Sequence, residues 1–155
     1  MVVYQIQFEK EIPAAALRQF LQDSYGIAPG EVYVGRIADR SVDDPRPVAM
    51  FTPPDHDEEF GWVLIGDTEL ADATGQDEVD LAVALSRAFR VRAVVDDGSL
   101  YPDRWRLVST DGSSGLVLTD EDAAAEGSLR IVHALEPISG EPDLTVVPPL
   151  DGADD

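Results

Sequence analysis

The sequence contains no cysteine, and only one of its 155 residues, Lys10, is a lysine. The absence of cysteine excludes thiol catalysis, thiolate metal sites and a disulfide framework. It also fits a reducing cytoplasm, where we expect the protein to act. The first ten residues, MVVYQIQFEK, hold neither a basic region nor a long apolar run, so we expect no signal peptide. No segment approaches the ~20 apolar residues of a membrane span, and we expect no membrane partner.

The sequence also lacks the short motifs that mark common catalytic sites. Neither GxxxxGK[ST] nor GxGxxG occurs, and DGSSG at 111–115 lacks the GxSxG spacing of a serine nucleophile. Zinc sites need convergent sets of histidine and cysteine, but the chain has only two histidines, His56 and His133. The acidic segment 67–78 has its glycine in the wrong position for an EF-hand. We therefore expect no metal, no cofactor and no enzymatic activity.

The sequence is rich in aspartate and glutamate and has a formal net charge of −20. Residues 55–80 hold ten acidic residues and no basic one, and residues 111–155 hold eleven acidic residues and one basic one. A surface of this sign disfavours nucleic acids and anionic lipids, which are bound by basic surfaces. It favours a basic partner, although solubility or salt adaptation would explain the same charge.

The hydrophobic pattern predicts a single α+β domain. The alternation in VYQIQF at 3–8 predicts a strand, and the spacing of apolar residues predicts two amphipathic helices over 13–25 and 77–89. Thr74 or Asp77 would cap the second helix. Further strands are expected at 31–37, 48–52, 60–66, 91–95 and 128–135, with a hairpin around residues 111–114 and a short helix or loop at 121–127.

Strands that come in runs, rather than alternating with helices, favour a mostly antiparallel or mixed sheet with the two main helices packed on one face. We expect this domain to span residues 1–136. Residues 137–155 contain four prolines and five aspartates or glutamates, so we expect a Pro/acid-rich C-terminal tail that is partly disordered. His133 would lie in a strand, as a core or sheet-face residue.

The charge blocks indicate where a partner would bind. Aromatic residues beside charge are common in protein interfaces, although Trp62 and Trp105 could equally be inward strand residues. The segment TPPDHDEEFGW at 52–62 opens the first acidic block, and the turn after residue 95 carries a second group of acids. We predict a partner-binding surface made by Asp55, Asp57, Glu58, Glu59, Asp96, Asp97, Tyr101 and Asp103.

In size, charge and element order the chain resembles the single-domain immunity proteins that neutralise bacterial polymorphic toxins. The resemblance rests on the β-α-β start through IPAAALRQFLQDSYG and on the helix–strand segment LAVALSRAFRVRAVVDDG. It implies a non-catalytic protein that occludes the active site of a cognate toxin domain, which we expect to be basic. No motif aligns residue by residue, so the resemblance assigns no site residues.

Three alternatives stay open at this point. The acidic residues could imitate duplex phosphates, as in a regulatory or DNA-mimic protein that blocks a nucleic-acid-binding partner. A deep apolar pocket around His56 or His133 would favour a small enzyme of unrecognised type. Self-association would favour a housekeeping subunit or a chaperone-like adaptor.

Overall fold

The fold is taken from a computed structural model, which describes residues 3–41, 43–54, 59–96, 104–125 and 129–148. Its helices are α1 (Ala14–Tyr25), α2 (Thr68–Thr74), α3 (Glu78–Phe89) and α4 (Glu121–Ala125), with 3-10 turns η1 (Pro29–Glu31) and η2 (Ile37–Asp39). Its strands are β1 (Tyr4–Phe8), β2 (Val32–Val34), β3 (Ala49–Thr52), β4 (Trp62–Gly66), β5 (Ala93–Asp96), β6 (Arg104–Val108), β7 (Ser114–Thr119) and β8 (Ile131–Ala134). None of the described helices has the length and apolarity that a membrane span needs.

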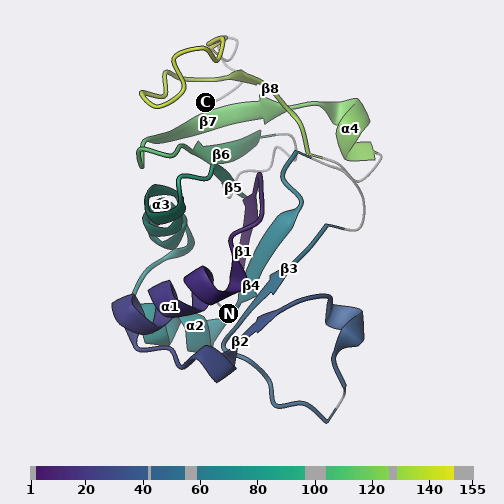
Figure 1. Ribbon diagram of the computed structural model, residues 1–155. Coiled ribbons are helices and arrows are strands. Elements are labelled where there is room, and N and C mark those ends of the chain that lie inside the picture. The colour runs from purple at the N-terminus through teal and green to yellow at the C-terminus, as the bar shows by residue number, and fades with distance from the viewer. Residues whose placement is uncertain (1–2, 42, 55–58, 97–103, 126–128, 149–155) are drawn as a thin grey trace.

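The eight described strands form one mixed sheet in the order β2-β3-β4-β1-β5-β6-β7-β8 (Figure 1). Only the β2–β3 pair at one edge is parallel, and all other neighbours are antiparallel. The predicted α+β class and the mostly antiparallel sheet are therefore confirmed. The strand expected over 31–37 is shorter than predicted, because η1 and η2 enclose the three residues of β2.

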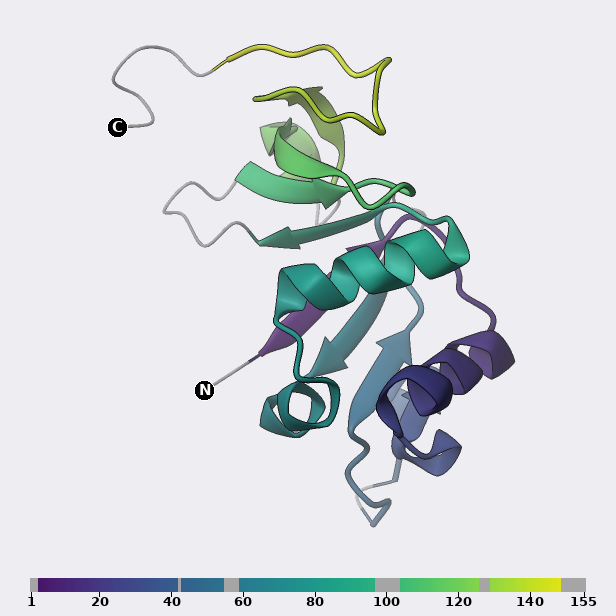
Figure 2. The ribbon, with the colours of Figure 1, turned by 90° about the vertical axis from the view of Figure 1, so that its left-hand side faces the viewer.

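Helices α1, α2 and α3 cover one face of the strands from β3 to β5, as Figure 2 shows from the helix side. The inward positions of β1 alternate as the sequence predicts, with Tyr4, Ile6 and Phe8 at most 1% exposed. Leu64 lies opposite Ile6, and Leu17 and Leu85 from the helices pack into the same cluster. This cluster is the larger of the two cores.

The second core lies on the opposite face of the sheet, and the C-terminal segment covers it. Val94, Leu107 and Val117 project from β5, β6 and β7 toward Ile138 and Leu144. The same segment pairs with β8, where the amide of Ala134 donates to Thr145 O and the amide of Val147 donates to Ala134 O, both at 2.8 Å. The loose tail expected from residue 137 onward is thus packed as far as residue 148, and residues 149–155 lie outside the described part of the chain.

The helix ends follow from local side-chain chemistry. The carboxylate of Asp77 accepts the amide of Asp80 at 2.8 Å, which confirms Asp77 as the cap of α3. Helix α1 ends at Gly26, whose φ of +70° suits glycine at this position. Helix α2 was not predicted. Asp67 caps it by accepting the amide of Glu69 at 3.2 Å.

Helix α2 packs on β4 through a position that needs glycine. A Cβ added to Gly66 would lie 2.9 Å from the Cβ of Leu70, closer than real side chains approach. We predict that Gly66→Ala lowers the free energy of unfolding by about 1–3 kcal/mol, because overpacking a tight site displaces its neighbours. Gly30→Ala is the matched control, since a Cβ at Gly30 meets nothing within 4 Å. Urea denaturation would measure both, and equal midpoints would contradict the prediction.

Candidate functional site

The eight residues of the predicted partner-binding surface do not lie at one place among the described residues. Six of them, Asp55, Asp57, Glu58, Asp97, Tyr101 and Asp103, lie outside the described part of the chain. Of the other two, Glu59 precedes β4 near the end of β1, whereas Asp96 ends β5 near the beginning of β1. The strands therefore hold these two carboxylates at opposite ends of the sheet. The single surface remains a prediction.

The two tryptophans are inward strand residues. Trp62 stacks on Phe51 at a centroid distance of 5.3 Å and packs on the helix-side core. Trp105 packs partly buried against the core under the C-terminal segment. Neither ring is therefore a free aromatic anchor on the surface.

Acidic residues of β5 and α3 lie close together where β5 ends and α3 begins, since the charges of Asp77 and Asp96 both act on Glu78, and α2, which precedes α3 in the chain, adds two more acids. We call this the acidic corner and define it as Glu69, Asp72, Asp77, Glu78, Asp80 and Asp96. Residues 47–86, which include α2 and most of α3, contain no lysine or arginine. All members of the corner are exposed except Glu78, which is half-buried. Asp96 is the one member that belongs to the predicted surface.

Glu78 is the structural centre of the acidic corner. Its Oε2 accepts the backbone amide of Gln5 at 2.7 Å, which fixes the start of β1 to the first turn of α3. Burial raises the pKa of Glu78, the Gln5 amide partly offsets this, and the charges of Asp96 and Asp77 raise the pKa further. The rise from Asp96 and Asp77 indicates that the corner concentrates negative potential. A cationic side chain from a partner would relieve this repulsion.

A second charged cluster lies at the other end of the sheet, around Arg92. Its Nε donates to Glu9 at 2.8 Å, its Nη1 donates to Glu141 at 3.0 Å, and its Nη2 lies 3.9 Å from Glu59. The guanidinium also stacks over Phe60, 5.6 Å from the ring centre. This cluster joins four segments that are distant in the sequence. We call it the Arg92 cluster.

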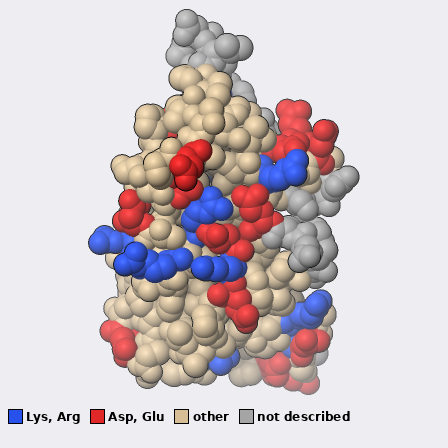
Figure 3. Space-filling model, turned by 45° about the horizontal axis from the view of Figure 1, so that its top comes forward, with Lys and Arg blue, Asp and Glu red and all other residues tan. Residues whose placement is uncertain are grey.

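Glu59 therefore has a structural environment that the sequence did not indicate. Burial raises its pKa, the charge of Arg92 lowers it in part, and Glu9 raises it again. Around the cluster, the basic residues Lys10, Arg90 and Arg92 share a hollow of about 410 Å³ with the acidic residues Glu9, Glu141 and Asp143. Figure 3 shows a face on which basic and acidic side chains stand next to each other in this way. The paired charges make this end of the sheet a structural joint more than a binding surface.

The described residues contain no arrangement typical of a catalytic centre. The hydroxyl of Ser109 is fully buried and donates to Glu141 at 2.6 Å, with no histidine described beside it. His133 lies opposite Leu118 in the sheet, partly buried, as the sequence predicted. Within the described ranges no group of three or more acidic or histidine residues could hold a metal ion. His56 lies outside those ranges.

The sequence did not predict that Glu78 would be a half-buried carboxylate at the centre of the acidic corner. It also did not predict that Arg92 would join four distant segments. The cap at Asp77 was a signal that the next residues start a helix, but nothing local pointed to Gln5. The partners of Arg92 are 83 and 49 residues away in the chain. No family model, no curated protein and no solved structure matches this chain.

The Arg92 cluster predicts a stability effect. Arg92→Met keeps an apolar side chain of similar length but leaves Glu9 and Glu141 without their cation, so we expect a loss of about 1.5–3 kcal/mol in the free energy of unfolding. Arg130→Met is the control, because the side chain of Arg130 is 66% exposed and forms its ion pair with Asp120, outside the Arg92 cluster. Its loss should stay below about 1 kcal/mol. Equal losses in urea denaturation would show that the cluster is an ordinary surface ion pair.

The raised pKa of Glu78 predicts how the free energy of unfolding changes with pH. Its folded pKa is raised above the ordinary value of 4.5, so the folded state binds the proton more tightly than the unfolded state. Below pH 4.5 the side chain is mostly protonated in both states, so it does not destabilise the fold. As the pH rises through the folded pKa, the buried side chain ionises, and the free energy of unfolding falls.

We expect Glu78→Gln, which keeps an acceptor for Gln5, to stabilise the protein by about 0.2–1 kcal/mol at pH 7 and to have no effect at pH 4. Glu69→Gln removes the same charge from an exposed position on α2. Thermal unfolding of both variants across this pH range checks the prediction. A Glu78→Gln difference that does not change with pH would contradict it.

Proposed function

We propose that this chain is a non-catalytic binding protein, and specifically an immunity protein that neutralises a basic toxin domain by covering its active site. The observation that carries the proposal is the acidic corner. There, burial raises the pKa of the half-buried Glu78, and the charges of Asp96 from β5 and Asp77 raise it further. Such a surface gains free energy when a cationic surface covers it.

The placement of the charges supports binding over solubility alone. A purely solvating surface would spread its charge, whereas this chain pairs acids with bases around Arg92 and leaves residues 47–86 without any base. The segments outside the described ranges add nine acidic residues and no basic one. Two of them, Asp97 and Asp103, are in the segment that follows Asp96.

The rigid sheet supports the same proposal. Glu78 is bound to the Gln5 amide and Asp77 caps α3, so the carboxylates are held before a partner arrives. Groups that are already ordered lose little conformational entropy on binding. Charge that is fixed in position speeds association with a partner of opposite sign, an effect that salt screens.

The test is capture of a partner from lysate of the native cell, followed by binding and inhibition measurements on the purified pair. We expect a basic protein whose toxicity is suppressed when the two are expressed together, and whose association slows steeply with added salt. A captured protein that binds nucleic acid and is not toxic would favour the regulatory or DNA-mimic alternative. An inhibited toxin with no salt dependence would contradict the electrostatic mechanism.

Charge reversal locates the contact surface. We expect the triple variant Glu69→Lys, Asp72→Lys and Asp80→Lys to weaken binding at least about 100-fold, because each position is exposed and none of the three carboxylates caps a helix. The control triple, Glu11→Lys, Glu121→Lys and Asp143→Lys, changes the net charge equally at exposed positions elsewhere. Equal weakening by both triples would mean that only net charge matters.

A further inference from the structure

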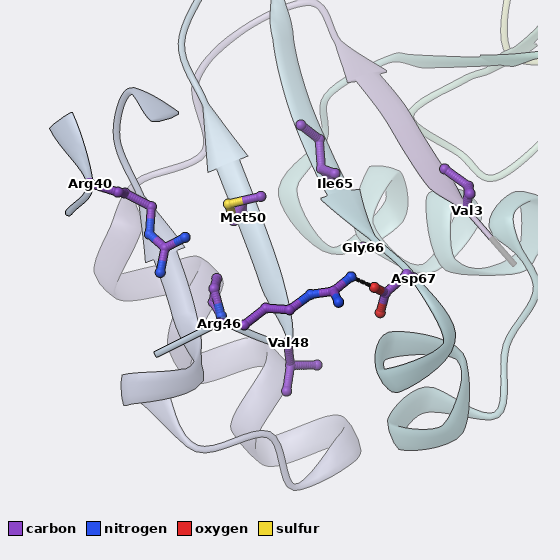
Figure 4. A pocket seen from close by; sticks show the side chains of 9 residues that line it. Val3, Arg40, Arg46, Val48, Met50, Ile65, Gly66 and Asp67 are labelled. Atoms are coloured by element: carbon purple, nitrogen blue, oxygen red, sulfur yellow. Dashed lines mark ion pairs between the residues drawn. The ribbon is translucent and has the colours of Figure 1, made fainter. Parts of the chain in front are cut away.

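One part of the sheet has an open hollow that neither core fills. On the face opposite the helices, Met50 of β3 lies beside Ile65 of β4, and Val3 and Val48 complete an apolar floor (Figure 4). The hollow has a volume of about 390 Å³, within the range of small-molecule sites, about 300–1,000 Å³. Arg40, Arg46 and Pro47, which lie between η2 and β3 in the chain, form its wall.

Two arginines extend from this wall to the hollow. Arg40 stacks over Tyr33 at 5.1 Å and donates from Nη2 to Pro45 O at 2.6 Å. Arg46 reaches across the strands and forms an ion pair with Asp67, as Figure 4 shows. A guanidinium has five N–H donors. The contacts described here use only part of this donor capacity.

We propose that this hollow binds a small amphiphilic carboxylate, with its apolar body on Met50 and Ile65 and its carboxylate on Arg46, while Arg40 adds positive charge at the rim. The fork of an arginine matches a carboxylate in two parallel hydrogen bonds. The apolar side chains supply the hydrophobic surface that such a body needs. None of the residues that line the hollow is a member of the acidic corner, and the proposal does not depend on the proposed function.

Asp67 gives the site a built-in competitor. The carboxylate of Asp67 forms an ion pair with the Arg46 guanidinium. A carboxylate ligand would therefore compete with Asp67 for the N–H donors of Arg46. Asp67 also caps α2 through the amide of Glu69. Asn is an equally good helix cap, so Asp67→Asn would remove the competing charge while keeping the acceptor.

The shape of the hollow favours a small ligand over a macromolecule. Val3 is the only large hydrophobic side chain of its floor that is exposed, at 57%, whereas Met50, Ile65 and Val48 are half-buried. A flat protein surface would touch only Val3 and the rim. A short chain that enters the hollow can reach the recessed side chains.

The experiment uses octanoate as the probe and the methyl group of Met50 as the reporter. The chain has only two methionines, so ¹³C-methyl methionine labelling gives two signals, and Met50→Leu assigns them. We expect octanoate to shift the Met50 signal in a saturable way. Acetate, which lacks the body, and octyltrimethylammonium, which has a cationic head, should not do so.

Two variants test the role of charge. Arg40→Gln combined with Arg46→Gln should weaken octanoate at least about tenfold, the effect of losing charge-assisted hydrogen bonds. Asp67→Asn should tighten it about fivefold, because it removes a like charge near the ligand. Arg130→Gln, the same charge change at an exposed arginine that does not line the hollow, should have no effect.

The proposal fails if octanoate does not shift the Met50 signal saturably in the wild-type chain. It fails also if octyltrimethylammonium binds as well as octanoate, since the site would then select only the apolar body. Unchanged octanoate affinity in Asp67→Asn would equally overturn it. That variant keeps the cap of α2, so it tests the charge even if the double arginine variant does not fold.

Discussion

The structure depends on how the two faces of its eight-stranded sheet are covered. The helices cover only part of one face, and the C-terminal segment covers only part of the other. Strands β5 and β6 are buried by both cores, because Ala93, Val95 and Val108 belong to the core under the helices, whereas Val94 and Leu107 belong to the core under the C-terminal segment. On one side of β5 the helices cover the front face, and on the other side the C-terminal segment covers the back. Each half of the sheet therefore leaves one face partly open. The hollow at Met50 and the half-buried row that includes Leu118 and His133 are both results of this arrangement.

The same arrangement explains where the Arg92 cluster and the acidic corner lie. Arg92 directly precedes β5 and lies where the C-terminal segment meets the rest of the domain, so its carboxylate partners come from both sides of the joint. At the other end of β5, Asp96 lies near enough to the first turn of α3 for its charge to act on Glu78, and there Glu78 accepts the Gln5 amide and Asp77 caps the helix. One end of the strand thus holds the domain together, and the other end presents its charge outward.

Much of the fold could be predicted because the deciding signals are local. Alternation in residues 3–8, the cap at Asp77 and the turn at residues 111–114 each fix an element without knowledge of the rest. Helix α2 was missed because it buries only Leu70 and Thr74, too few positions to show a helical period. The packing of residues 137–148 was missed because Ile138 and Leu144 stand alone among prolines and acids. The Arg92 cluster and the Met50 hollow arise from strand order, which no local pattern contains.

The C-terminal cover has a consequence for the order in which the protein folds during synthesis. Strands β5 to β7 are complete once residue 119 has been made, but Ile138, Glu141 and Leu144 follow later. Until then the C-terminal segment cannot cover the side chains of Val94, Leu107 and Val117, and Arg92 has no ion pair with Glu141. The nascent chain therefore exposes an apolar sheet face for as long as the ribosome needs to add about twenty more residues, a few seconds at ~5–20 residues per second. A chaperone that recognises extended apolar strands would find its substrate in this interval.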